Sequence, residues 1–166
     1  MKLRAYRPED LTEIAQLFYD TIHAVNARDY SREQVQAWAG GREHFLCRND
    51  FFLSLYTIVA VDGGRIVGYG NIDDTGYLDH LFVHKDFQGL HIATAICGEL
   101  ERHALAQGHK AVTVNASITA KPFFEKRGYE TVKKQQVTVR GVSLTNYSMI
   151  KEWPDSKRRH FAIGRS

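Results

Sequence analysis

The sequence predicts one α/β (α+β) domain, built on a single mixed central β-sheet with helices on both faces. Three observations predict it. Residues 56–84 hold three apolar, β-branched segments separated by glycine-containing turns, which is typical of an antiparallel meander. Residues 77–115 then follow the order strand, helix, strand, and such a crossover requires its two strands to be parallel. Residues 130–151 form a hairpin about Gly141, so the sheet contains pairs of both kinds.

Two helices are expected between a first strand, residues 2–6, and the meander. The first runs from Pro8 to about residue 25, because proline suits the first helical position and apolar residues then recur at three- and four-residue spacing. Ser31 and Gln34 match a capping box for the second, which ends at a pair of glycines. Residues 42–54 follow no clean period and are assigned no element.

The rest of the chain alternates between the two periods. Residues 92–108 carry apolar side chains at four-residue spacing and predict a helix that ends near a glycine. A short strand, residues 111–115, and a short helix, residues 119–127, follow. The two strands of the closing hairpin are residues 130–140 and 143–151.

Residues 1–152 are expected to form this domain, and residues 153–166 a basic C-terminal tail. Apolar residues make up 43% of the chain and charged residues 25%, as in ordinary soluble proteins. Lys plus Arg exceed Asp plus Glu by 22 − 19 = 3, too small a surplus to imply nucleic acid. Because no stretch approaches the roughly 18 apolar residues of a membrane span and the start lacks a signal-peptide pattern, we expect a cytoplasmic protein without membrane partners.

The two cysteines, Cys47 and Cys97, have neither metal-site spacing nor the pattern of a disulfide framework. Cys97 lies in an apolar helical pattern and is expected to be a small buried hydrophobic residue. No metal is therefore expected.

The segment after the third meander strand is the most informative one. It follows the order strand, glycine-bearing loop, helix start, and a helix N-terminus offers unpaired N–H groups and a positive dipole end. Such a site binds phosphate without a cationic side chain. Gly89 permits close backbone approach, and the small Ala93 and Thr94 leave room beside the first turn. A glycine that only turns the chain into a surface helix would give the same pattern.

Two motifs in this order resemble the GNAT (N-acetyltransferase) superfamily. Gln88-Gly89-Leu90-His91-Ile92-Ala93 is similar to its pyrophosphate loop, Gln/Arg-x-x-Gly-x-Gly/Ala, with His91 in place of the usual glycine. Residues 115–129 resemble the family's downstream segment, Asn-x-x-Ala-x-x-Phe-Tyr-x-x-x-Gly-Phe. The resemblance covers about residues 1–150 and implies the GNAT fold, acetyl-CoA as co-substrate and N-acetyltransferase activity.

By this resemblance, two central parallel strands splay apart and the backbone of Phe82 and Val83 pairs with the pantetheine arm of acetyl-CoA. A backbone N–H at the bulge polarises the thioester carbonyl. Asn115 and either Phe123 or Phe124 contact the arm from the far side of the gap. The residues implied at the pyrophosphate are Gln88, Gly89, Leu90, His91, Ile92, Ala93 and Thr94.

Direct transfer needs a neutral amine, so a base or a water chain must remove a proton. Asp79 is the first candidate, because regular strand alternation would place it on the same side as Leu81 and Val83. His80, with an ordinary pKa near ~6.5, is the alternative. Asp79 as a structural carboxylate that caps a turn or pairs with a cation is the competing interpretation.

Many family members protonate the leaving thiolate with a tyrosine at the second aromatic position of the downstream motif. Here that position is Phe124, which has no hydroxyl. Tyr129 and Tyr147 are the substitutes to consider. A thiol pKa near ~8.5 also makes unassisted departure chemically reasonable, and our hypothesis is that this chain lacks the usual tyrosine acid.

The first two helices of this fold usually cover the acceptor pocket, and His23 and Tyr30 are the candidate acceptor-binding residues. A small molecule with a primary amine is the favoured acceptor, and a protein or peptide N-terminus or lysine is the alternative. The changes at His91 and Phe124 also keep open a non-catalytic module that binds acetyl-CoA. The short basic run 157–160 is interpreted as a solvated tail rather than a nucleic-acid site, and a homodimer is possible.

Overall fold

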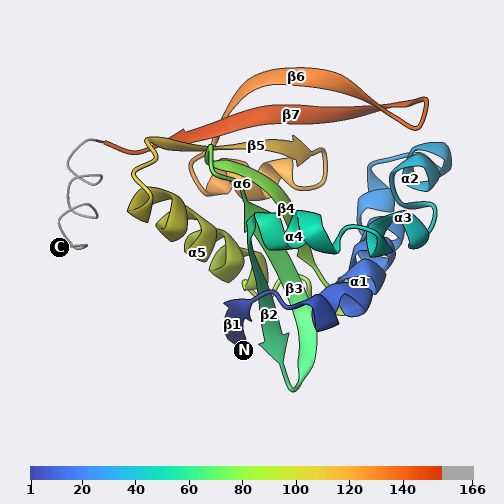
Figure 1. The fold of residues 1–166 in the computed structure, drawn as a ribbon. Coiled ribbons are helices and arrows are strands. Elements are labelled where there is room, and N and C mark those ends of the chain that lie inside the picture. The colour runs from blue at the N-terminus through green and yellow to red at the C-terminus, as the bar shows by residue number, and fades with distance from the viewer. Residues whose placement is uncertain (155–166) are drawn as a thin grey trace.

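The computed structural model of the chain describes residues 1–154 and contains one seven-stranded sheet in the order β1-β2-β3-β4-β5-β7-β6 (Figure 1). Neighbouring strands are antiparallel except for β4 and β5, which are parallel. The strands are β1 (Lys2–Ala5), β2 (Tyr56–Asp62), β3 (Arg65–Ile72), β4 (Tyr77–Val83), β5 (Ala111–Ser117), β6 (Glu130–Val139) and β7 (Val142–Glu152). The predicted mixed sheet, its meander and its parallel pair are confirmed.

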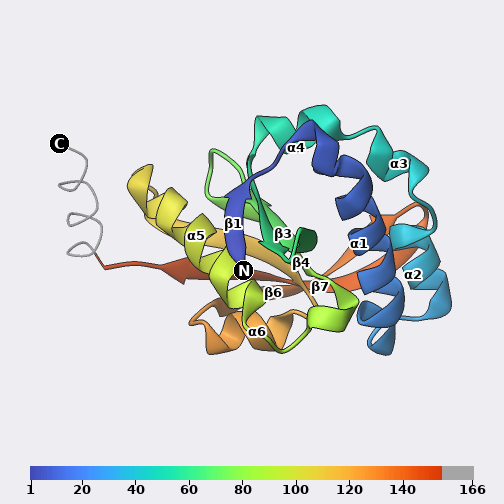
Figure 2. The ribbon, with the colours of Figure 1, turned by 90° about the horizontal axis from the view of Figure 1, so that it is seen from below.

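Helices cover both faces of the sheet, with α5 and α6 on one side and α1 to α4 on the other (Figure 2). Their bounds are α1 (Leu11–Ala24), α2 (Arg32–Ala39), α3 (Glu43–Leu46), α4 (Asn49–Ser54), α5 (Ile92–Ala106) and α6 (Lys121–Lys126). Three short 3₁₀ turns, Pro8–Asp10, Asn26–Arg28 and Lys85–Phe87, precede α1, α2 and α5 respectively.

The local sequence explains how these helices begin. The Ser31 side chain accepts a hydrogen bond from the Gln34 amide, and the Gln34 side chain accepts one from the Ser31 amide, so the predicted capping box of α2 is confirmed. The helix expected from Pro8 begins as a 3₁₀ turn and becomes α-helical at Leu11. The unassigned residues 42–54 form α3 and α4.

Apolar side chains fill a separate core on each face. Ile58 and Val67 point to the α5 face, where they join Ile96 and Leu100. Val59 and Tyr69 point to the other face and join residues of α1, α3 and α4. This alternation along β2 and β3 is what a sheet buried on both faces requires.

Glycine lets α5 approach β3 closely. A Cβ atom on Gly70 would lie 2.9 Å from the His80 carbonyl oxygen and 2.9 Å from a methyl carbon of Ile96. The missing side chain therefore fixes the height of α5 above the sheet.

One part of the predicted tail belongs to the domain. Trp153 is buried in the core on the α5 face, and its amide donates to the Lys110 carbonyl. The domain therefore extends past residue 152, and the rest of the tail, residues 155–166 with its basic run, lies outside the described residues.

Within residues 1–154, no helix is long and apolar enough to cross a membrane.

Candidate active site

The parallel strands β4 and β5 separate soon after they meet. They pair only through Tyr77 with Thr113 and Leu78 with Val114, although β4 continues to Val83. Figure 1 shows the two strands diverging from this point. Beyond Leu78, β4 is therefore bonded to β3 on one side and open on the side of the gap.

A β-bulge lies where the gap begins. Asn71 opposes His80 and Ile72 opposes Leu78, so Asp79 has no partner on β3. The His80 amide donates instead to the Asn71 side-chain oxygen at 2.9 Å. Because the bulge interrupts the alternation, the expectation that Asp79 lies on the same side of the strand as Leu81 and Val83 is wrong.

The β3–β4 ladder determines which backbone groups face the gap. The His84 amide donates to the Val67 carbonyl at 2.8 Å, and in an antiparallel ladder every second pair is hydrogen-bonded. The next bonded pair is formed by Phe82, opposite Tyr69. The backbone groups of Leu81 and Val83 therefore point into the gap. The prediction of Phe82 with Val83 is corrected to Leu81 with Val83.

Side chains already use one of these groups. The Val83 carbonyl accepts hydrogen bonds from the Thr21 hydroxyl at 3.0 Å and from the Gln88 side-chain amide at 2.7 Å. Gln88, which was predicted at the pyrophosphate, thus fastens its loop to the end of β4. The Leu81 amide and carbonyl and the Val83 amide are the groups left for a ligand.

A cavity of about 1300 Å³ extends through the gap. Residues of α1 and of the segment 38–48 line it on one face of the sheet, and the loop 87–94 and α6 line it on the other. The gap thus joins two half-sites, one on each face, in a single cavity.

The loop before α5 adopts two left-handed residues, Gly89 with φ 73° and His91 with φ 62°. Nothing lies within 4 Å of a Cβ built on Gly89, so the backbone there is open to approach. His91 is the N-cap of α5 and makes no side-chain cap, and the first turn has no acidic residue. The first amides of α5 therefore lack a side-chain acceptor, which suits an anion.

Most of the residues predicted to bind the cofactor surround this cavity. Leu90 does not: its side chain is 62% exposed and does not line the cavity. The others that line it are Phe82, Val83, Gln88, Gly89, His91, Ile92, Ala93, Thr94, Asn115, Phe123 and Phe124.

Comparison with known proteins decides the family. Residues 26–151 match the family model described as an acetyltransferase (GNAT) domain. The uncharacterized N-acetyltransferase YafP of Escherichia coli (strain K12) is 32% identical over 150 residues, which cover 90% of this chain and 94% of that protein. The chain belongs to the GNAT acetyltransferase family.

Solved structures share the GNAT fold. A crystal structure from Rhodopseudomonas palustris, described as a GCN5-related N-acetyltransferase (Aminotransferase, Class-II), is 35% identical with a TM-score of 0.85 over 92% of this chain and 95% of that one. PaiA N-acetyltransferase of Thermoplasma acidophilum, solved in complex with coenzyme A, is 16% identical with a TM-score of 0.72 over 92% and 98%.

Asp79 of this GNAT chain is an exposed carboxylate on the cavity wall. Partial desolvation raises its pKa above the ordinary value, Arg48 acts in the opposite direction and Asp73 adds to the rise. A carboxylate with a raised pKa is a better proton acceptor than a free one.

His80 is a weak base in this position. Its ring lies among aromatic side chains, and Nδ1 is 2.9 Å from the Tyr69 hydroxyl. Burial, with a smaller contribution from Arg48, lowers the pKa of His80 to about 3. The imidazole is therefore neutral at ordinary pH and binds a proton poorly, which leaves Asp79 as the stronger candidate.

Tyr129 lies outside the cavity. Its buried hydroxyl donates to Glu101 at 2.7 Å, within a group that also includes Arg127. Tyr147 does not line the cavity either, and the Lys121 ammonium lies 4.9 Å from its ring centre. Neither tyrosine is placed to protonate a group in the gap, so the prediction of Tyr129 as a catalytic residue is corrected.

The two predicted acceptor residues lie in different places. Tyr30 lines the cavity, and its hydroxyl donates to the Thr145 carbonyl at 2.7 Å and accepts from the Ile118 amide at 2.9 Å. His23 does not line it: its ring stacks on Tyr19 at 4.0 Å. His23 is half-buried on a part of α1 that does not face the cavity.

Among the lining residues that the sequence did not indicate are Leu81, Tyr77 and Arg48. Leu81 depends on the ladder register, and Tyr77 is simply the first residue of β4. Arg48 lies in the segment between α3 and α4, where the sequence has no period that would assign a face.

Proposed function

We propose that this chain transfers the acetyl group of acetyl-CoA directly to the primary amine of a small molecule. The observation that carries the proposal is the cavity through the β4–β5 gap, which joins the uncapped start of α5 to Asp79. One half-site thus suits an anionic thioester and the other an amine.

The residues present fit acetyl-CoA. The amides of Ile92, Ala93 and Thr94 would receive the pyrophosphate, and the open loop at Gly89 allows its approach. The free backbone groups of Leu81 and Val83 would pair with the arm. The complex of PaiA with coenzyme A supports this assignment by analogy of fold.

The transfer forms a C–N bond and breaks the C–S bond of the thioester. Asp79 accepts the proton that the ammonium must lose, directly or through water. The Leu81 amide is the candidate donor to the thioester carbonyl, because the bulge amide of His80 is occupied by Asn71.

The thiolate departs without a tyrosine acid at position 124 in our hypothesis. Among residues 1–154, the tyrosines that line the cavity are Tyr30, whose hydroxyl already has two partners, and Tyr77. Turnover that survives in Tyr77→Phe and accelerates in Phe124→Tyr supports unassisted departure. Loss of turnover in Tyr77→Phe, with acetyl-CoA affinity retained, assigns the acid to Tyr77 instead.

The cover over the acceptor half-site favours a small molecule over a peptide. Residues 26–54 form α2, α3, α4 and their connections, and Trp38, Phe45 and Arg48 of this segment line the cavity. An ordered cover of this kind leaves less room for an extended chain than an open groove does.

Titration calorimetry with acetyl-CoA, followed by free-thiol release with parallel panels of small amines and peptides, tests the proposal. Thiol release with small amines is the expected result. Preferential release with peptides would establish the alternative acceptor. Tight binding with no release from any acceptor would indicate a non-catalytic acetyl-CoA-binding module.

A further inference from the structure

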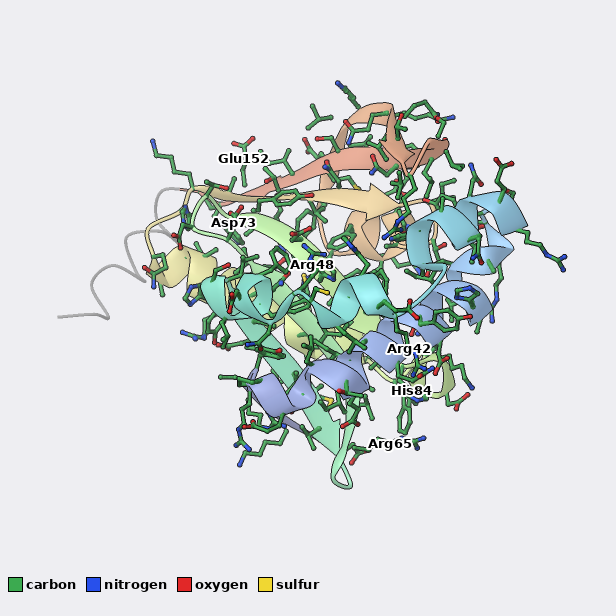
Figure 3. All side chains as sticks on the ribbon, turned by 45° about the vertical axis from the view of Figure 1, so that its right-hand side comes forward. Arg42, Arg48, Arg65, Asp73, His84 and Glu152 are labelled. Atoms are coloured by element: carbon green, nitrogen blue, oxygen red, sulfur yellow. The ribbon has the colours of Figure 1, made fainter. Side chains whose placement is uncertain are left out.

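Arg48 stands between α3 and α4 and reaches the wall of the cavity on the face opposite α5 (Figure 3). Its guanidinium carbon lies 3.9 Å from the centre of the Phe51 ring and 6.0 Å from that of Phe52. The side chain is half-buried. Packing on an aromatic face holds the guanidinium in place without using its hydrogen-bond donors.

Other half-buried arginines of the fold have carboxylate partners. Arg4 pairs with Asp10 at 2.8 Å, and Arg127 pairs with Glu101 at 2.7 Å. Within the described residues, no carboxylate lies within 4 Å of the Arg48 guanidinium. Arg48 therefore presents an unpaired positive charge to the cavity.

The acidic and basic side chains on this half of the cavity are separate from one another. Asp79 is the acidic residue that lines it in the described part of the chain, and Arg48 is close enough to act on the pKa of Asp79 without forming an ion pair. Arg140 also lines the cavity, but its guanidinium donates to the Ala37 carbonyl. His44 and the neutral His80 are the imidazoles on this side.

Aromatic rings occupy the space beside these two charges. Phe18, Phe45, Trp38 and Phe82 all line the cavity, and Phe82 lies 5.1 Å from Phe18 and 6.4 Å from Trp38 between ring centres. A ligand here meets a negative group, a positive group and an apolar wall.

We propose that the acceptor is an amino acid-like molecule that carries a carboxylate as well as its amine and has an apolar side chain. Its amine faces Asp79, its carboxylate binds Arg48 and its side chain packs on the aromatic wall. This inference rests on the proposed small-amine acetyltransferase function. Arginine suits the role because its planar fork offers a carboxylate two parallel hydrogen bonds.

Binding of the reaction products tests the inference. Their acetylated nitrogen does not ionise, so each acid differs from its carboxamide only in the charge of the carboxylate. N-acetyl-L-phenylalanine, N-acetyl-L-leucine and N-acetyl-L-methionine are titrated calorimetrically into the full chain saturated with coenzyme A, each beside its neutral carboxamide. A hydrogen-bonded charge pair contributes about 1.5–3 kcal/mol, so at least one acid should bind about tenfold or more tightly than its amide. In Arg48→Gln that preference should disappear, with amide affinity changed less than about threefold.

Two further variants sharpen the result. Arg48→Lys keeps the charge but not the fork and should retain part of the preference. Arg42→Gln is the matched control, because Arg42 donates to Gln16 outside the cavity (Figure 3). This variant should leave both affinities unchanged.

Three outcomes would overturn the inference: acids and amides that bind alike in the unmodified chain, no binding of any acid, or an Arg48→Gln variant that weakens both members of a pair equally. Thiol release with phenethylamine, a neutral-tailed amine, separates this failure from that of the proposed function. Acetylation of phenethylamine with no acid preference overturns the carboxylate inference alone. Failure to bind acetyl-CoA overturns both.

Discussion

Asp79 occupies a bulge, where no ladder partner constrains it, and it faces a cavity that only partly solvates its charge. The raised pKa means that folding penalises the ionised form. The stability that protonated Asp79 contributes is present below its unfolded-state pKa and is lost as pH rises through its folded-state pKa.

Asp79→Asn should therefore separate activity from stability. We expect kcat/KM to fall by about 10²–10³, as removal of a general base does, and Tm at neutral pH to stay or rise because an ionised group has been removed. The unmodified chain should lose activity as pH falls through the raised pKa of Asp79, and the variant should lack that limb. Initial rates against pH, with Tm by calorimetry, measure both effects. A parallel loss of activity and Tm would instead favour the structural role for this carboxylate.

His91 occupies the position where the family pattern has glycine, and the structure gives the physical reason for that glycine. With φ 62°, His91 adopts the left-handed conformation that costs residues with a Cβ about 1–2 kcal/mol. The strain is in the backbone.

His91→Gly should relieve this strain and raise Tm by a few degrees, since about 1 kcal/mol shifts a domain of this size by roughly 2–4 °C. His91→Ala keeps the Cβ and is the control without relief. Scanning calorimetry of the two variants decides the matter. A Tm for His91→Gly at or below that of His91→Ala would mean that the left-handed conformation is not strained here.

At the scale of elements, α1 could be predicted from its apolar period and α2 from its capping box, whereas the helices in residues 42–54 could not be predicted. Phe45 and Phe52 are buried there while Leu46 and Leu53 are exposed. Helices of four and six residues are too short for a period to appear. The cover over the acceptor half-site, Arg48 included, was therefore hidden in the sequence.

Tyr30 fastens this cover to the sheet, because its hydroxyl bonds to both Thr145 on β7 and Ile118 after β5. Tyr30→Phe leaves a carbonyl and an amide without that partner, at about 1–3 kcal/mol for each group that stays buried. We expect a lower Tm and a raised KM for the acceptor, with the Kd for acetyl-CoA almost unchanged. Calorimetry and steady-state kinetics measure these quantities. An equal loss of affinity for both substrates would mean that Tyr30 supports the whole cavity rather than its cover.

At the scale of the whole molecule, the mixed sheet could be predicted from its crossover and meander, while the exact gap-facing residues required the register. The insertion of β7 between β5 and β6 is a non-local pairing that no local pattern encodes. The same holds for Glu101, an α5 residue that joins Arg127 after α6 and Lys151 of β7 at 2.7 and 3.7 Å.

Glu101→Gln should destabilise the fold by about 3 kcal/mol, because two cations lose their buried counter-charge. Burial opposes ionisation of Glu101, but hydrogen bonds from Arg127 and Tyr129 prevail and lower its pKa. Its contribution is therefore present above the unfolded-state pKa and lost as pH falls through the folded-state value. Urea unfolding at neutral and acidic pH measures the difference, which should shrink in acid. A difference that is independent of pH would mean that the charge of Glu101 does not contribute.

The sheet is continuous in topology but nearly divided at its centre, since two residue pairs alone connect β4 with β5. Any molecule that pairs with the free edge of β4 completes the missing rungs and joins the halves mechanically. Deuterium uptake at the Leu81 and Val83 amides should consequently be fast in the empty protein and slow when the gap is filled. The exchange rates of these two amides therefore report whether a molecule occupies the gap.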